Sequence, residues 1–198
     1  MKTGTIILAA GNSSRLGVPK QLINFNGMTL LQSISSIALN AALGPVIVVE
    51  GHNNYPLTSH PRLIKVVNLE WEKGMGSSLK LGLKMLVKNY LPDQVLILLS
   101  DQPMVSNELI QHLLDTKANS KLPIVASHYQ NSLGVPAIFD KSVFEMLQLM
   151  PDEEGAKRIL ISNSALVSLV NFEAGKIDID TPSDLIALKK SDWSHFNS

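Results

Sequence analysis

Short apolar runs alternate along the chain with longer segments in which apolar residues recur at helical spacing. The short runs are continuously apolar rather than alternating, which is typical of strands in a parallel sheet that is covered on both faces. We expect seven strands, at residues 5–8, 46–49, 64–67, 95–99, 124–126, 137–139 and 166–170.

The longer segments predict helices, and several begin at a residue that commonly caps one. Thr29 and Ser106 each precede apolar residues spaced three and four apart, so each is expected to be an N-cap. Ser77 or Ser78 is expected to cap the helix between them. Three more helices are expected, after Asp140, after Pro151 and at Thr181-Pro182.

Strands that alternate with helices predict right-handed crossovers and a doubly wound α/β arrangement. No internal repeat, low-complexity tract or linker divides the 198 residues. We therefore expect a single domain over residues 1–190, followed by a polar C-terminal tail over 191–198.

The composition excludes several classes of protein. The chain has 17 basic and 17 acidic residues and a net charge of zero, which argues against a nucleic-acid partner. It has no cysteine, which excludes disulfides, zinc fingers and iron–sulfur clusters. The apolar run at the N-terminus is too short for a signal peptide, and none is long enough for a membrane span. We expect a cytoplasmic protein with no membrane partner.

The segment 8–20 has the composition of an anion-binding turn. Its small residues allow backbone N–H groups to approach an anion, and Arg15 and Lys20 supply two cations five residues apart. Backbone donors, a guanidinium and an ammonium group together suit a polyphosphate. The same composition also occurs in ordinary βα turns with solvated cations, and the residues alone leave both interpretations open.

Asp101 follows the most strand-like run in the chain, 95–99. A carboxylate there costs free energy unless a cation or hydrogen-bond donors satisfy it. With a triphosphate opposite, Asp101 is suited to hold a hydrated Mg²⁺, which needs only one or two protein oxygens. The alternative is an aspartate that caps the turn leading to Ser106.

Two further segments have candidate chemistry. Residues 74–79 approach the dinucleotide-binding pattern G-x-G-x-x-G, but Leu79 replaces its third glycine. Asp178 and Asp180 lie on the same side if their segment is extended, so one of them can complete a metal site. Asp180 or Thr181 can equally cap the last helix.

These residues together resemble a known signature. The segment Leu8-Ala9-Ala10-Gly11-x-Ser13-x-Arg15-x-Gly17-x-Pro19-Lys20 resembles the nucleotide-binding motif of MobA-like nucleotidyltransferases, and most closely the molybdenum cofactor (molybdopterin) cytidylyltransferase branch. The resemblance covers about residues 4–188. The other matching motifs follow in the same order, at residues 74–79, 100–103, 134–137, 154–157 and 178–182.

The resemblance implies a Rossmann-like three-layer sandwich of the nucleotide-diphospho-sugar transferase fold, with a mostly parallel sheet. It also implies Mg²⁺-dependent transfer of a nucleoside monophosphate from an NTP, with release of pyrophosphate. Ala10 favours CTP over GTP in this family. By motif match, the catalytic residues are Arg15, Lys20 and Asp101, the metal ligands are Asp101 and Asp180, and the nucleotide is contacted by Leu8, Ala9, Ala10, Gly11, Arg15, Lys20, Gly76 and Ser77.

The resemblance favours molybdopterin as the acceptor and a molybdoenzyme as the eventual client. One departure concerns that acceptor, because Val135 stands where these cytidylyltransferases often have a histidine. The same chemistry on a sugar or alditol phosphate therefore stays open. So does a non-catalytic, molybdopterin-binding chaperone, whereas a dinucleotide-dependent oxidoreductase lacks its glycine pattern.

Overall fold

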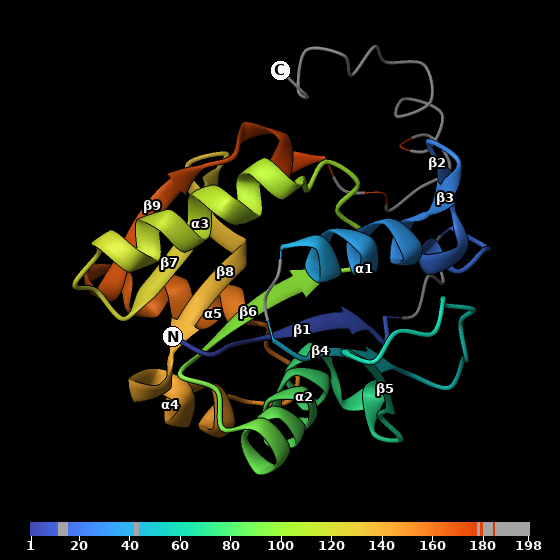
Figure 1. Ribbon diagram of the computed structural model, residues 1–198, viewed down its shortest axis with the longest axis horizontal. Coiled ribbons are helices and arrows are strands. Elements are labelled where there is room, and N and C mark those ends of the chain that lie inside the picture. Colours follow the sequence, from blue (N-terminus) through green and yellow to red (C-terminus); the bar gives the residue numbers. More distant parts are fainter. Residues whose placement is uncertain (12–15, 42–43, 178, 180–183, 185–198) are drawn as a thin grey trace.

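The computed structural model describes residues 1–11, 16–41, 44–177, 179 and 184 (Figure 1). Its seven-stranded sheet has the order β5-β4-β1-β6-β8-β7-β9. The helix expected at Thr181 and the tail over 191–198 lie outside the described residues. The strands are β1 (Thr3–Ala9), β4 (Val46–Glu50), β5 (Leu63–Val67), β6 (Gln94–Leu99), β7 (Ile124–Tyr129), β8 (Ser132–Asp140) and β9 (Val167–Asn171).

The sheet is mostly parallel, as expected, but β8 runs against both of its neighbours. Strands β5, β4, β1 and β6 are parallel to one another, and β9 is parallel to β7. Only two residues, Gln130 and Asn131, connect β7 to β8, and both have positive φ angles, of 50° and 54°. A two-residue connection can join only antiparallel strands, which explains the reversal.

Helices cover both faces of the sheet and make the three-layer sandwich (Figure 1). On β1, Ile6 and Leu8 face a core cluster that includes residues of α2, α4 and α5. Ile7 and Ala9 face the opposite cluster, with α1 and α3. The helices are α1 (Leu30–Asn40), α2 (Met75–Tyr90), α3 (Asn107–Asn119), α4 (Phe144–Leu149) and α5 (Ala156–Ser162). No helix in the described ranges is long and apolar enough to cross a membrane.

Two of the three expected N-caps are confirmed. The Thr29 hydroxyl accepts a hydrogen bond from the Gln32 backbone N–H at 3.2 Å, and the Gln32 side chain accepts from Thr29 N–H at 3.0 Å. This reciprocal pair is a capping box. The Ser106 hydroxyl accepts from Leu109 N–H at 3.3 Å and caps α3.

The expectation that Ser77 or Ser78 caps α2 was wrong. The helix begins at Met75, and its N-cap is Gly74, whose φ of 124° is a conformation that favours glycine. The Ser77 hydroxyl, inside the first turn, donates to the Gly74 carbonyl at 2.8 Å. The helices expected after Asp140 and Pro151 exist, but α4 follows a 3₁₀ turn (Lys141–Val143) and α5 begins only at Ala156.

A small hairpin links the anion-binding segment to α1 and was not expected from the sequence. Strands β2 (Asn24–Phe25) and β3 (Met28–Thr29) pair antiparallel. Asn26 and Gly27 between them have φ angles of 52° and 84°, as an Asn-Gly hairpin turn requires. The hairpin connects the 3₁₀ helix that begins at Lys20 (η1, Lys20–Leu22) to the start of α1.

Candidate active site

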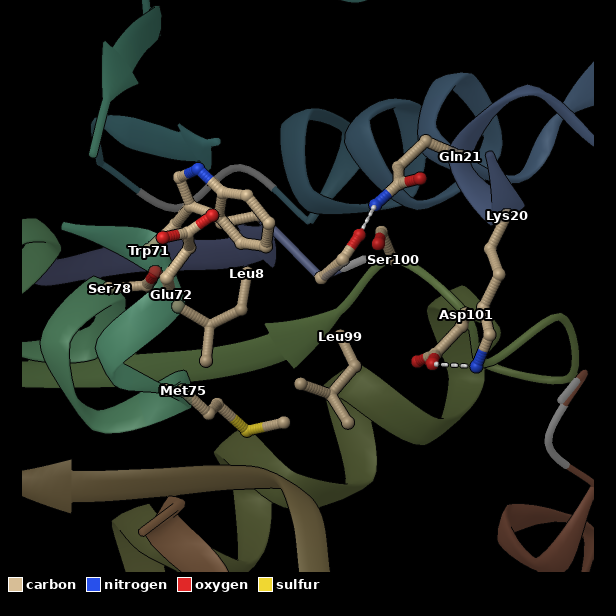
Figure 2. A pocket seen from close by; sticks show the side chains of 13 residues that line it. Leu8, Lys20, Gln21, Trp71, Glu72, Met75, Ser78, Leu99, Ser100 and Asp101 are labelled. Atoms are coloured by element: carbon tan, nitrogen blue, oxygen red, sulfur yellow. Dashed lines mark hydrogen bonds and ion pairs between the residues drawn. The ribbon is translucent and has the colours of Figure 1, made fainter. Parts of the chain in front are cut away.

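A cavity of about 300 Å³ opens at the carboxyl ends of β1 and β6. Open parallel sheets bind ligands at this edge, outside the strand ends. Four segments converge on the cavity: the end of β1, the η1 helix, the turn that enters α2, and the end of β6 (Figure 2). The lining residues are Leu8, Ala10, Gly11, Lys20, Gln21, Trp71, Glu72, Gly74, Met75, Ser78, Leu99, Ser100 and Asp101.

Lys20 and Asp101 meet at one end of this cavity, although 81 residues separate them in sequence. The Lys20 ammonium nitrogen lies 3.2 Å from Asp101 Oδ2, and the two side chains are 15% and 26% exposed. Asp101 lies two residues after the end of β6, the neighbour of β1, so the sheet order carries it to the turn that begins after Ala9. The structure therefore places a cation and a carboxylate side by side in the lining of the cavity, where a ligand can reach both.

Gln21 ties the end of β1 and Gly11 to the η1 helix. Its side chain is only 2% exposed, and its amide nitrogen donates to the backbone carbonyls of Ala9, at 2.8 Å, and Gly11, at 3.4 Å. Its amide oxygen is buried and has no hydrogen-bond partner within the described ranges. Sequence analysis did not single out Gln21, because a glutamine beside a lysine has no distinguishing pattern.

The first turn of α2 forms the opposite wall. The Asn68 amide donates to the hydroxyls of Ser77 and Ser78, at 2.9 Å each. Ser78 lines the cavity, but Gly76 and Ser77 are not among its lining residues. A Cβ on Gly76 would lie 2.3 Å from the Pro151 carbonyl oxygen, so Gly76 faces the chain after α4. Contact of Gly76 and Ser77 with a nucleotide stays a prediction.

Away from this charged end, the cavity is apolar and aromatic. Trp71 lies at the far end, and Leu8, Met75 and Leu99 line the cavity between the two ends (Figure 2). The Trp71 indole packs against the His52 ring, with centroids 5.1 Å apart and the planes tilted by 37°. Sequence analysis missed Trp71, because a single tryptophan in a connecting segment carries no spacing signal.

The residues present fit a divalent metal at the charged end. Asp101 is a partly exposed carboxylate in the cavity, and a hydrated Mg²⁺ needs only one or two protein oxygens. The described residues contain no group of three or more histidine, aspartate or glutamate side chains placed to enclose an ion. Arg15, Asp178 and Asp180, which the sequence assigned to phosphate or metal, lie outside the described residues.

Val135, the position of the missing histidine, is buried and does not line the cavity. Its side chain belongs to the core cluster that includes Leu8. Its carbonyl oxygen accepts a hydrogen bond from the Gln102 amide at 3.0 Å, which ties β8 to the segment that carries Asp101. The Val135 backbone therefore helps to position the charged end of the cavity.

Comparison with known proteins gives matches over nearly the whole chain. The chain is 27% identical to purine catabolism protein PucB of Bacillus subtilis, over 94% of this chain and 95% of that protein. It is 28% identical to nicotine blue oxidoreductase of Paenarthrobacter nicotinovorans, over 92% and 94% of the two chains. Rv0371c from Mycobacterium tuberculosis superposes with a TM-score of 0.79 at 24% identity, over 96% of this chain and 98% of that one.

The comparisons agree with the layers of the fold. The expected three-layer α/β fold is confirmed, and the solved neighbours share it. Residues 5–167 match the family model described as the MobA-like NTP transferase domain, a range that contains most of β1, the segment 8–20 with Lys20, and Asp101. Because this match covers most of the chain, the chain belongs to the MobA-like NTP transferase family and is a nucleotidyltransferase.

Proposed function

We propose that this nucleotidyltransferase transfers CMP from CTP to a phosphate-bearing acceptor, which is molybdopterin, and releases pyrophosphate. The observation that carries the proposal is the approach of Lys20 and Asp101 to 3.2 Å, in a cavity at the carboxyl ends of β1 and β6. A phosphate-binding cation and a metal-binding carboxylate are the groups that nucleotidyl transfer needs most.

The reaction needs little covalent help from the chain. An oxygen of the acceptor phosphate attacks the α-phosphorus of CTP, and the bond from that phosphorus to the pyrophosphate oxygen breaks. A phosphate nucleophile is already ionised near pH 7, so the step requires no general base. No histidine lines the cavity in the described part of the chain, which agrees with such a step.

The residues of the turn would bind and orient the triphosphate. Lys20 supplies a positive charge for the phosphate oxygens, and Gln21 holds the carbonyls of Ala9 and Gly11 in place. Arg15 belongs to the same proposed set. Groups fixed before the substrate arrives stabilise the developing charge without reorganising during the step.

Asp101 would hold Mg²⁺, with Asp180 as its proposed second acidic contact. When bound, the ion would neutralise charge on the triphosphate and on the leaving pyrophosphate. A structure of Rv0371c in complex with manganese, with a TM-score of 0.77 at 22% identity over 97% of this chain and 100% of that one, supports the proposal, because that neighbour shares the fold and binds a divalent ion.

CTP is the proposed donor because Ala10, the residue that favours it in this family, lines the cavity. Molybdopterin is the proposed acceptor because the motifs match that branch, and a molybdoenzyme would then be the client. A sugar or alditol phosphate is the competing acceptor, because the Val135 side chain packs in the core where the branch often has a histidine.

The relative named nicotine blue oxidoreductase raises a second candidate, a reduction reaction. Against this candidate, the Gly74–Leu79 segment lacks the third glycine of a dinucleotide-binding pattern, and Gly76 packs against protein backbone. Oxidation of NADH or NADPH by the purified protein, with a quinone-like dye as acceptor, would favour the oxidoreductase.

The experiment that tests the proposal is an acceptor screen that follows pyrophosphate release. The purified chain is mixed with CTP, GTP or ATP, and with molybdopterin, a sugar phosphate or an alditol phosphate. Pyrophosphate release with CTP and molybdopterin is expected, together with its loss in EDTA and its recovery on adding Mg²⁺. Tight molybdopterin binding with no pyrophosphate from any NTP would favour the chaperone and overturn the proposal.

A further inference from the structure

The cavity has two chemically different ends, and the residues that the proposed transfer of CMP assigns to phosphate and metal lie at only one of them. Lys20 and Asp101 lie at one end, and Trp71 and Glu72 lie at the other (Figure 2). We infer that Trp71 and Glu72 bind a flat heterocycle that carries an exocyclic amino group. This inference rests on the proposed function, because it assigns the ring of one of that reaction's two substrates.

The first support is the fixed orientation of the Trp71 indole. A Cβ on Gly51, directly after β4, would lie 3.2 Å from Trp71 Cγ, so the absence of a side chain there lets the indole pack against the backbone. The His52 ring packs against the indole as well. An aromatic group that is already fixed by its neighbours loses little conformational freedom when a ligand ring stacks on it.

The second support is the neighbouring carboxylate. Glu72 lines the same cavity, and in Figure 2 its side chain lies at the same end as the Trp71 indole. Glu70, two residues earlier, forms an ion pair with Lys73, whereas Glu72 has no ion pair or hydrogen bond within the described ranges. A carboxylate next to an aromatic face is a suitable acceptor for an amino group on the edge of a stacked ring.

The third support is the apolar floor between the two ends. Leu8, Met75 and Leu99 line it, and a thioether packs favourably against an aromatic ring. The cavity therefore offers a charged end for phosphates, an apolar middle and an aromatic end with one acceptor. Cytosine and pterin both have a flat ring with an amino group, so the site chemistry fits the base of the donor and the ring of the acceptor alike.

The experiment separates these two sources with four variants. Trp71→Leu removes the stacking surface, Trp71→Phe keeps a smaller one, Glu72→Gln removes the charge, and Glu70→Gln is the matched control on a glutamate outside the cavity. For each variant, KM is measured separately for CTP, UTP and the acceptor, and Kd is measured for tripolyphosphate, which has no ring.

Trp71→Leu is expected to raise the KM of the ring-bearing substrate by about tenfold to a hundredfold, with Trp71→Phe intermediate. The Kd of tripolyphosphate and all parameters of Glu70→Gln should stay unchanged. If the ring is cytosine, the KM for CTP rises and Glu72→Gln reduces the preference for CTP over UTP. If the ring belongs to the acceptor, only the acceptor KM rises. Either result supports the inference.

A binding measurement keeps the inference testable if Trp71→Leu does not fold. The chain has two tryptophans, and Trp193→Phe leaves Trp71 as its single indole fluorophore. In this variant, CTP or the acceptor should quench the fluorescence, and tripolyphosphate should not. Equal responses to all three ligands, or unchanged KM values in an active Trp71→Leu, would overturn the inference while the proposed function stands. Quenching by CTP with no pyrophosphate release from any acceptor would overturn the proposed function and keep the heterocycle site.

Discussion

Two carboxylates stand at the ends of parallel strands in this sheet, and their surroundings differ sharply. Glu50 is the last residue of β4 and is 1% exposed. It forms an ion pair with Lys65, at 3.0 Å, and accepts a hydrogen bond from the Tyr55 backbone N–H, at 3.1 Å. Asp101 follows β6, is 26% exposed, and faces the cavity beside Lys20.

The comparison teaches that a lysine partner at about 3 Å does not by itself mark a functional acid. Lys65 lies on β5, the neighbour of β4, and it also donates to the Tyr55 carbonyl, so the Glu50 pair holds the segment between these strands. Burial, reinforced by the charge of Glu50, raises the pKa of Tyr55, although a hydrogen bond from Asn53 opposes the shift. What makes Asp101 a candidate for chemistry is that its pair with Lys20 lies in a cavity, whereas the Glu50 pair does not.

The largest expected effect is the loss of activity in Asp101→Ala. Removing the proposed metal ligand should lower kcat by about 10³-fold or more, because the ion's stabilisation of the transition state is worth several kcal/mol. The midpoint of thermal unfolding should change little. Pyrophosphate release and a thermal melt measure the two quantities. Asp101→Asn is the isosteric control, and activity close to wild type in either variant would contradict the metal assignment.

Glu50→Ala is expected to show the opposite behaviour. Removing the buried carboxylate leaves the Tyr55 N–H without an acceptor and Lys65 without its ion-pair partner, which should lower the free energy of unfolding by about 3–5 kcal/mol. Urea titration followed by circular dichroism measures this change. Glu50→Gln keeps an acceptor for Tyr55 N–H and should lose less stability. A Glu50→Ala protein that is as stable as wild type and inactive would place Glu50 with the chemistry instead.

Lys20→Ala is expected to act mainly on substrate binding. Losing one charge-assisted contact with the triphosphate should raise the KM for CTP by about tenfold to a hundredfold. Lys20→Arg, which keeps the charge with a different shape, should lose less. Initial rates at varied CTP concentration measure both, and an unchanged KM in Lys20→Ala would remove Lys20 from the phosphate site.

Ser106→Ala should have the smallest effect on stability and activity. It tests whether the start of α3 helps to position Asp101. Losing the N-cap of α3 should lower the free energy of unfolding by about 1 kcal/mol. KM and kcat should stay at wild-type values, because the carboxylate is not touched. A large loss of activity would show that the position of Asp101 depends on the start of α3.

Much of the fold could be predicted, because continuous apolar runs and capping residues are local signals. Thr29 and Ser106 cap helices as expected. The reversal of β8 was not predictable, because the turn at Gln130 and Asn131 has no glycine to indicate positive φ angles. The start of α2 was misplaced because a serine was preferred to Gly74, whose glycine-favouring conformation is visible only in the structure.

The site was predictable as far as it follows strand ends. Lys20 and Asp101 were found because each lies in a polar segment after an apolar strand. Their distance depends on β1 and β6 being neighbours, which no local pattern encodes. Gln21 and Trp71 reach the cavity only through tertiary packing, and therefore neither could be assigned from the sequence.

The close packing at Gly76 couples the start of α2 to the loop before α5. A methyl group there would come within 2.3 Å of the Pro151 carbonyl oxygen and 2.7 Å of that of Glu154. The loop before α5 and the wall formed by Met75 and Ser78 must therefore change in concert. A chimera that receives this loop from a homologue would need the homologue's α2 entrance as well, so the two segments are best exchanged as a unit.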